Sequence, residues 1–435
     1  MWASQYSMPG TPERVISQPK ISQKARARDI AGSYPEMDNA GHERASLRIR
    51  SVRIAGAAYG CDVEQRVGPS SRVTPIRMSQ LERRFLVTRL GSLLLNAPMP
   101  VVRTLAGREP TVIDGRTLNV RLQALLAIGA KLDRPDRGHD LAKVRGAMDK
   151  MARWGMPRRT GVSVSGIRLG GPGGDLPVRV YRSDRAVAVP PVIVYFHGGG
   201  WATCGLDTHD GSCRLLADES KCTVVSVDYR LAPEHSFPAA VDDAFFAYRW
   251  VRDNAEALSV SRGRVGVMGD SAGGTLAAAV SVAARDVGAQ PPFAQCLVYP
   301  SLDATISTAS CTSMGDGPWL SYDDIVWYRS MYLPDPATWT SPLASPARVA
   351  DLSIFPPTLL YAAGFDPLRD DAELFADGLD ATGVPVRYRC FDDQIHGFFG
   401  MGILHESMAI AVEICTAMGE EMHRPLAHTS EGPKP

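Results

Sequence analysis

The chain has 435 residues, of which 45% are hydrophobic and 22% are charged, and its 47 basic side chains balance its 47 acidic ones. This length can bury a large core, and zero formal charge argues against nucleic acid or an anionic membrane as the main partner. No apolar run reaches membrane-spanning length, because the best candidate, residues 86–102, carries Arg89 and two prolines.

The first 77 residues are rich in Ser, Gly, Arg and Pro and show no sustained helix or strand period. We expect residues 1–77 to be a disordered, mildly basic extension and residues 426–435 to be a disordered tail. No apolar segment typical of a signal peptide follows the start. The eight cysteines form no CxxC pair and no Cys/His cluster with zinc spacing, which indicates free thiols in a reducing, cytoplasmic compartment.

Helical patterns dominate residues 78–155. The first convincing helix opens at Met78, and breaks such as Gly91 and Pro110 separate it from those that follow. We therefore predict a helical segment over 78–155, ahead of a core that we place at 156–425.

From about Val162 strands and helices alternate. Predicted strands lie within 163–183, which holds two around a Gly/Pro turn, and at 191–196, 222–229, 264–269, 293–300, 357–364 and 385–391. Predicted helices lie at 207–220, 238–254, 273–286 and 370–383. The strands are almost continuously apolar, which indicates that both sheet faces are covered. The alternation predicts an α/β fold with a mostly parallel, doubly wound sheet, interrupted by an insertion at about 302–345.

The motif GDSAG at 269–273 directly follows an apolar strand and directly precedes an Ala-rich helix. This strand–turn–helix context is the one that a nucleophile elbow requires, and it predicts Ser271 as a nucleophile at a helix N-terminus. The alternative is that Ser271 only caps the helix.

A serine nucleophile needs a general base, and His396 is the histidine in a loop after the last predicted strand. The chain order Ser, Asp or Glu, then His favours this residue over a merely solvated loop histidine. Asp366 lies at the exit of the preceding strand, so we predict that it orients His396. Asp370 and Asp371 begin the next helix, where a carboxylate stabilises the helix dipole without catalytic duty.

Two more carboxylates, Asp392 and Asp393, are too near His396 in sequence to be the preferred acid. The stretch HGGGW at 197–201 follows a buried strand, and its glycines leave backbone N–H groups bare for an oxyanion. His197 is expected to brace this loop and Trp201 to pack beneath it. The predicted oxyanion donors are Gly198, Gly199, Gly200 and Ala272. The sequence leaves open which two of the three glycines donate, although Gly199 with one neighbour is favoured.

Six motifs occur in order along the chain. They are HGGGW (197–201), DYRLAPE (228–234), FPAA (237–240), GDSAGG (269–274), AGFDPLRD (363–370) and HGF (396–398). As a set they resemble the bacterial hormone-sensitive lipase family (family IV carboxylesterases/lipases) of the α/β-hydrolase fold, and its actinobacterial, mycobacterial members in particular. The resemblance covers roughly residues 78–420.

The resemblance implies an eight-stranded core under a helical cap, built from 78–155 and the insertion at 302–345. It also implies the triad Ser271, Asp366 and His396, a preference for short to medium acyl chains, and a homodimer through the last strand and helix. Many members of the family carry Asn where this chain has Thr275 and Glu where it has Asp371. We expect these two differences to alter local hydrogen bonding without loss of activity.

The predicted function is that of a cofactor-free serine carboxylesterase or lipase that cleaves a small-molecule ester or an acylglycerol through an acyl-enzyme. Peripheral association with lipid surfaces is compatible with that function. An amidase or peptidase on the same fold is one alternative, since acyl transfer serves both. A non-catalytic ligand-binding receptor is another, because plant gibberellin receptors resemble this family but have lost the histidine that is present here.

Overall fold

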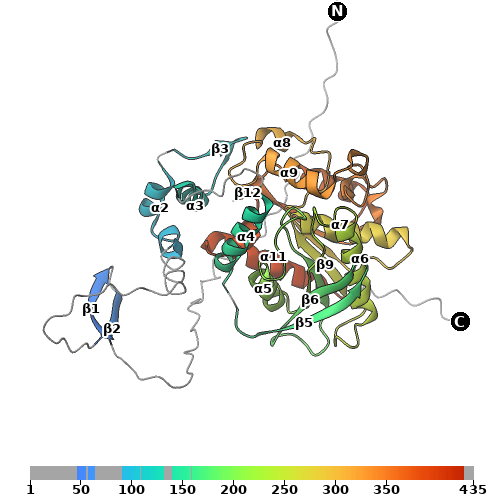
Figure 1. Ribbon diagram of the computed structural model, residues 1–435, viewed down its shortest axis with the longest axis horizontal. Helices are drawn as coiled ribbons and strands as arrows, with labels where there is room; N and C mark the ends of the chain where they lie inside the picture. Colours follow the sequence, from blue (N-terminus) through green and yellow to red (C-terminus); the bar gives the residue numbers. More distant parts are fainter. Residues whose placement is uncertain are drawn as a thin grey trace, which may run out of the picture. The chain divides into compact units, whose positions relative to one another are not determined.

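The computed structural model describes residues 47–54, 57–63, 91–107, 109–131, 140–157 and 159–425 (Figure 1). The chain divides into two compact units, Met1–Arg77 and Met78–Pro435. In the first unit, β1 (Leu47–Ile54) and β2 (Ala57–Val63) form an antiparallel pair, where the sequence predicted no strand. The rest of that unit, the helix predicted from Met78 up to residue 90, and the predicted tail at 426–435 lie outside the described residues.

The second unit is built on an eight-stranded sheet with the order β12-β11-β10-β9-β7-β8-β6-β5. Its strands are β5 (Val162–Gly171), β6 (Gly174–Ser183), β7 (Val192–Phe196), β8 (Thr223–Val227), β9 (Val265–Asp270), β10 (Gln295–Val298), β11 (Thr358–Phe365) and β12 (Val386–Ile395). The hairpin β5–β6 joins β8 antiparallel, and all other pairs are parallel. The predicted mostly parallel sheet is confirmed.

Helices cover both faces of this sheet. They are α5 (Asp210–Ser220), α6 (Ala239–Asp253), α7 (Ala272–Asp286), α10 (Arg369–Ala381) and α11 (His405–His423). Successive side chains of β7 alternate between two cores: Val192 and Val194 pack with α6, α7 and α10, whereas Ile193 and Tyr195 pack with α5 and α11. Two-sided burial explains why the strands are apolar throughout.

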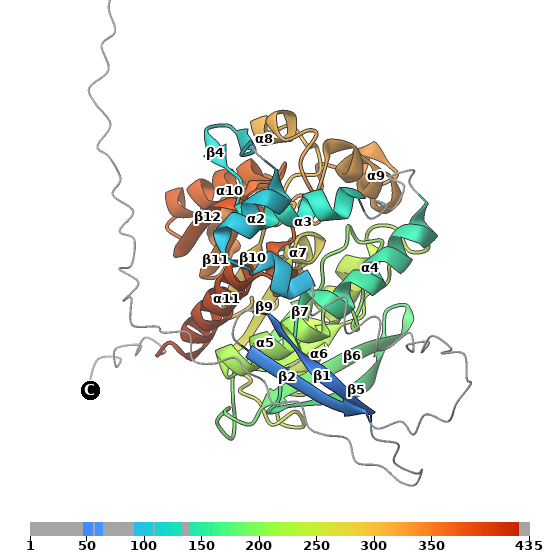
Figure 2. The ribbon, with the colours of Figure 1, turned by 90° about the vertical axis from the view of Figure 1, so that its left-hand side faces the viewer.

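The cap contains α2 (Met99–Ala106), the short strands β3 (Val112–Ile113) and β4 (Arg116–Thr117), α3 (Val120–Lys131) and α4 (Leu141–Gly155). The insertion after β10 adds α8 (Ala309–Ser313) and α9 (Tyr322–Tyr332). Side chains of α2 and α3 share an apolar cluster with Phe365 and Ile395, the last residues of β11 and β12. The cap therefore lies over the carboxyl ends of these strands, as Figure 2 shows for α2, α3 and α8.

The cysteines between Cys204 and Cys415 are free thiols, as predicted. Within the described parts of the chain, no helix combines the length and the apolar character needed to cross a membrane.

Candidate active site

Ser271 stands at the turn between β9 and α7 with φ 55° and ψ −124°, a backbone conformation that non-glycine residues rarely adopt. The turn is held by the Ser271 N–H, which donates to the carbonyl of Val298 at 2.8 Å. A Cβ on Gly269 would overlap the backbone of Gly273, and a Cβ on Gly273 would overlap the carbonyl of Phe196. The two flanking glycines are therefore required by close backbone approach, which is the geometry of a nucleophile elbow.

The three residues predicted as nucleophile, base and acid are in direct contact. His396 Nε2 lies 2.9 Å from Ser271 Oγ, and His396 Nδ1 lies 2.7 Å from Asp366 Oδ2. Because a carboxylate can only accept, the second contact puts the ring proton on Nδ1 and leaves Nε2 free to accept from the serine hydroxyl. Asp366 is fully buried, and its other oxygen accepts from the Leu368 N–H at 2.9 Å.

All three residues follow the carboxyl ends of parallel strands in one half of the sheet. Ser271 follows β9, Asp366 follows β11, and His396 follows β12. In an open α/β sheet this edge is where ligands bind.

The last strand is longer than the sequence indicated. It was predicted to end at residue 391, yet β12 continues to Ile395, so Asp392 and Asp393 belong to the strand. Both carboxylates hold the cap: Asp392 binds Arg116 at 2.8 Å, and Asp393 accepts from the side-chain amide of Asn119 at 2.9 Å. Neither is a partner of His396, in keeping with the choice of Asp366 as the acid.

The N–H groups of the glycine loop after β7 are of two kinds, those with and those without an acceptor in the described chain. The Gly198 N–H donates to Asp270 Oδ1 at 3.0 Å. Among the described residues, no hydrogen bond uses the N–H of Gly199, Gly200 or Ala272. Gly199 and Gly200 have φ values of 118° and 59°, which glycine adopts without steric cost.

The need for glycine in this loop differs from the reason inferred from sequence. A Cβ on Gly199 would overlap Thr203, and a Cβ on Gly200 would overlap the ring of Tyr328 on α9. Glycine is therefore needed at these positions because Thr203 and Tyr328 lie too close for a side chain, and its lack of a side chain also leaves the N–H groups bare.

His197 and Trp201 have supporting positions, as predicted. The His197 ring is fully buried, stacks on Tyr229 at 4.3 Å, and has Nδ1 2.8 Å from the Gly198 carbonyl. Burial lowers the pKa of His197 to about 3, so the ring is neutral. Trp201 is buried and stacks on Tyr332 of α9 with ring centroids 4.6 Å apart.

The two departures from the family pattern meet at one place. Thr275 Oγ1 donates to the carbonyl of Ser301, and Asp371 Oδ2 accepts from the N–H groups of Leu302 and Asp303 at 3.2 Å each. Burial raises the pKa of Asp371 to about 7. Asp371 is thus a buried acceptor that fixes the root of the cap insertion, a role the sequence analysis missed when it assigned the residue to the helix dipole.

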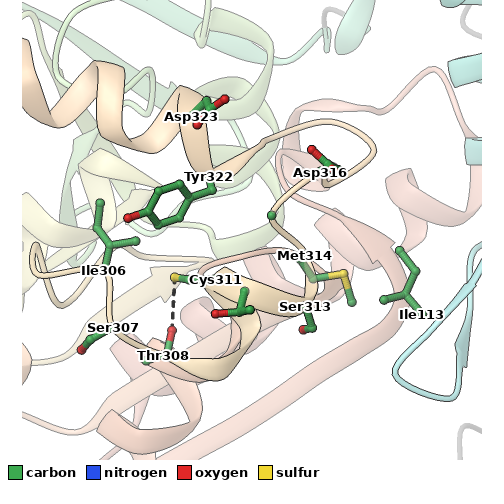
Figure 3. Close-up of a pocket in the computed structure, with 12 residues that line it drawn as sticks. Ile113, Ile306, Ser307, Thr308, Cys311, Ser313, Met314, Asp316, Tyr322 and Asp323 are labelled. Atoms are coloured by element: carbon green, nitrogen blue, oxygen red, sulfur yellow. Dashed lines mark hydrogen bonds between the residues drawn. The ribbon is translucent and has the colours of Figure 1, made fainter.

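Figure 3 shows a pocket of about 560 Å³ in the cap, between β3, α8 and the start of α9. Its walls include Ile113, Ile306 and Tyr322, and its lining contains none of Ser271, Asp366 and His396. Met314 connects the pocket to the site, because it packs with the residues that precede the acid and the base. The pocket belongs to the cap and not to the reaction centre.

Comparisons with known proteins agree with this geometry. A family model described as alpha/beta hydrolase fold matches residues 193–400. The carboxylic ester hydrolase LipN of Mycobacterium tuberculosis is 39% identical over 348 residues, which make up 76% of this chain and 92% of LipN. The carboxylesterase NlhH of the same organism is 42% identical over 241 residues, or 54% of this chain and 75% of NlhH.

Solved structures give the same picture. A hyperthermophilic esterase from the archaeon Pyrobaculum calidifontis matches with a TM-score of 0.64 and 39% identity, over 69% of this chain and 97% of its own. An alpha/beta hydrolase enzyme from the metagenome of Lake Arreo, Spain, matches with a TM-score of 0.66 and 36% identity, over 69% of this chain and 96% of its own.

Proposed function

This chain belongs to the hormone-sensitive lipase family of α/β hydrolases, and we propose that Ser271, His396 and Asp366 are its catalytic triad. The protein is a carboxylic ester hydrolase. The observation that carries the residue assignment is the unbroken pair of contacts, 2.9 Å from Ser271 to His396 and 2.7 Å from His396 to Asp366.

In the proposed reaction Ser271 Oγ attacks the ester carbonyl carbon while its proton passes to His396 Nε2. The tetrahedral intermediate collapses, the bond from the acyl carbon to the alcohol oxygen breaks, and the alcohol leaves with the proton from His396. Water then attacks the acyl-enzyme by the same route and releases the acid and free Ser271. Asp366 holds the ring orientation and stabilises the imidazolium in both halves.

For the oxyanion we propose the N–H groups of Gly199, Gly200 and Ala272 as donors. Gly198, which the sequence analysis included, is a weaker candidate because its N–H already donates to Asp270. The absence of an acceptor on the other three within the described chain supports this choice, since donors must be in place before the charge develops.

The proposed substrates are small-molecule esters or acylglycerols with short to medium acyl chains. Two rings of α9 support this preference, because Tyr328 lies against Gly200 and Tyr332 stacks on Trp201. These contacts bring the cap directly onto the oxyanion loop, beside the proposed donors. Turnover of p-nitrophenyl esters from acetyl to palmitoyl tests this, and a maximum at palmitoyl would overturn it.

Two further proposals concern the setting of the enzyme. The free thiols fit a reducing, cytoplasmic compartment. A homodimer would use β12, which is the edge strand of the sheet, together with α11. Size-exclusion chromatography with light scattering tests the dimer, and a monomer at micromolar concentration would remove that proposal.

The triad is tested by turnover of p-nitrophenyl butyrate by wild type, Ser271→Ala and a matched control, Ser281→Ala. Ser281 is a buried serine on α7 that approaches only Gln295. We expect Ser271→Ala to lose activity on the order of 10⁶-fold, because a triad without its nucleophile retains only binding and oxyanion effects, and Ser281→Ala to stay near wild type. Equal rates for wild type and Ser271→Ala would remove the proposal. Matched anilide substrates, turned over as fast as esters, would favour an amidase.

A further inference from the structure

The residue directly before the nucleophile has no role in the reaction described so far. We propose that Asp270 is a positioning residue that aims the oxyanion loop by binding the Gly198 N–H, and that His209 supports its carboxylate from the other side. The proposal rests on the proposed triad and oxyanion donors.

Asp270 accepts hydrogen bonds from three sides. Its Oδ1 accepts from the Tyr195 hydroxyl at 2.6 Å and from the Gly198 N–H at 3.0 Å. Its Oδ2 lies 3.5 Å from the Tyr299 hydroxyl, which also donates. These donors come from β7, from the loop after β7, and from the residue after β10, so one carboxylate joins three neighbouring strand ends.

The bond to Gly198 fixes one loop relative to the other. Asp270 and Ser271 are consecutive, and Gly198 precedes the two glycines whose N–H groups have no acceptor in the described chain. Other hydrogen bonds fix this loop to its own neighbours, such as that from the Thr203 N–H to the Gly199 carbonyl, whereas the bond from Gly198 to Asp270 ties it directly to the strand that carries Ser271. Gly198 and the Asp270 carboxylate are in close contact, since a Cβ on Gly198 would lie 2.5 Å from Asp270 Oδ2.

A buried negative charge beside a forming oxyanion would oppose catalysis unless it were balanced. His209 lies beside this carboxylate, with Nε2 3.4 Å from Asp270 Oδ1, where a ring N–H stabilises the negative charge. Burial by itself raises the pKa of Asp270, yet His209 and the Tyr195 hydrogen bond outweigh that effect and hold the pKa below its usual value. The second nearby imidazole, His197, is neutral and contributes no charge.

Asp270 also reaches the general base indirectly. The Tyr299 ring packs against the His396 ring with centroids 4.7 Å apart, and the Tyr299 hydroxyl donates to Asp270. Loss of the carboxylate would therefore disturb the oxyanion loop most and the packing of His396 to a smaller degree.

The test separates transition-state geometry from general stability. Wild type, Asp270→Asn and Asp270→Ala are compared for kcat and KM with p-nitrophenyl butyrate. Each variant is also titrated with an alkyl trifluoromethyl ketone, which forms an oxyanion on the serine, and with the corresponding secondary alcohol, which fills the site without reacting. Asp243→Asn is the matched control, because Asp243 is equally buried but pairs with Arg230 away from the site.

We expect Asp270→Ala to lower kcat about 10²–10³-fold, the size of losing an oxyanion donor, with KM within about threefold. The amide oxygen of Asp270→Asn cannot accept from every present donor, so we expect a smaller loss of about tenfold. The Ki of the ketone should rise by the same factor as kcat falls, while the Ki of the alcohol stays unchanged.

Two results would overturn the proposal. The first is that Asp270→Asn keeps the kcat and the ketone Ki of wild type. This variant alone decides the test if Asp270→Ala does not fold. The other is an equal loss of ketone and alcohol binding, which would mean a merely structural role. In either case inactivity of Ser271→Ala would leave the triad itself intact. For the neighbouring ring, His209→Ala should weaken ketone binding and kcat together by about threefold to tenfold, and unchanged values would remove His209 from the proposal.

Discussion

The two halves that enclose the site are held together in different ways. The floor, formed by the ends of β7, β9, β11 and β12, is fixed by close backbone approach and by buried hydrogen bonds such as that from Gly198 to Asp270. The cap packs on the core through the apolar cluster that contains Phe365 and Ile395, and at its surface it adds ion pairs between side chains: Arg116 with Asp392, Arg121 with Glu406, and Arg145 with Glu234. In each of these pairs the acidic side chain is at least 43% exposed.

Exposed ion pairs contribute little each, about 0–1 kcal/mol, whereas a buried network tolerates no missing partner. The comparison therefore leads us to propose that the floor, with the proposed triad, tolerates little change, while the surface pairs of the cap can change without disturbing it. The experiments below test this division, starting with the largest expected effect.

Asp366→Asn changes a fully buried residue of the floor. The amide cannot hold the His396 ring in the tautomer that accepts the serine proton, so we expect kcat for p-nitrophenyl butyrate to fall about 10⁴-fold. Asp392→Asn, on the neighbouring strand but paired with the cap, should stay within about threefold of wild type. A larger effect at Asp392 than at Asp366 would mean that the acid was assigned wrongly.

Gly200→Ala tests a place where the glycine loop and the cap touch tightly. Its Cβ would overlap the ring of Tyr328, so the loop must shift and we expect kcat to fall about 10²-fold. Combining it with Tyr328→Ala should restore part of that loss, because the overlapping ring is gone. No recovery in the double variant would show that the backbone conformation of Gly200, and not the cap, demands glycine.

Arg145→Met loosens the cap without touching the floor. Arg145 on α4 donates to the carbonyl of Ala202, just past the glycine loop, and pairs with Glu234 at 2.6 Å. We expect kcat/KM to fall about threefold to tenfold, with a smaller difference from wild type in high salt, because salt screens the exposed pair. Arg168→Met, which removes an exposed pair on β5, is the control and should match wild type. Equal losses in both variants would contradict the division.

Asp371→Asn tests the anchor of the cap insertion through stability. Burial raises the pKa of Asp371 to about 7, above its usual 3.8. Its contribution to the free energy of unfolding is therefore fully present below pH 3.8 and is lost as the pH rises through 7. Denaturation in urea from pH 4 to pH 8 should show wild type losing stability relative to the variant across that range. A constant difference between the two proteins would contradict the raised pKa.

The sequence predicted that the three proposed triad residues lie together because each stands at a strand end that the apolar pattern marks. Ser271, Asp366 and His396 all follow such strands in the chain order of this fold. The end of β12 was missed because its residues FDDQ look like a solvated loop. They form a strand because Asp392 and Asp393 bind cap residues more than 270 positions earlier in the chain.

The sequence could not decide between the three glycines for a similar reason. The answer depends on a hydrogen bond from Gly198 to a side chain 72 residues later. The same holds for Asp371 and Thr275, whose shared target at 301–303 is visible only in three dimensions. Local sequence patterns indicate which strand carries a side chain, whereas hydrogen bonds to residues far away in the sequence decide what that side chain does.

The most direct test of the account is to locate the nucleophile by covalent labelling. Wild type and Ser271→Ala are treated with diethyl p-nitrophenyl phosphate, and their peptides are analysed by mass spectrometry. We expect one diethylphosphoryl group per wild-type chain, on the peptide that contains Ser271, and none on the variant. Phosphorylation of another serine, or equal labelling of the variant, would contradict the central claim.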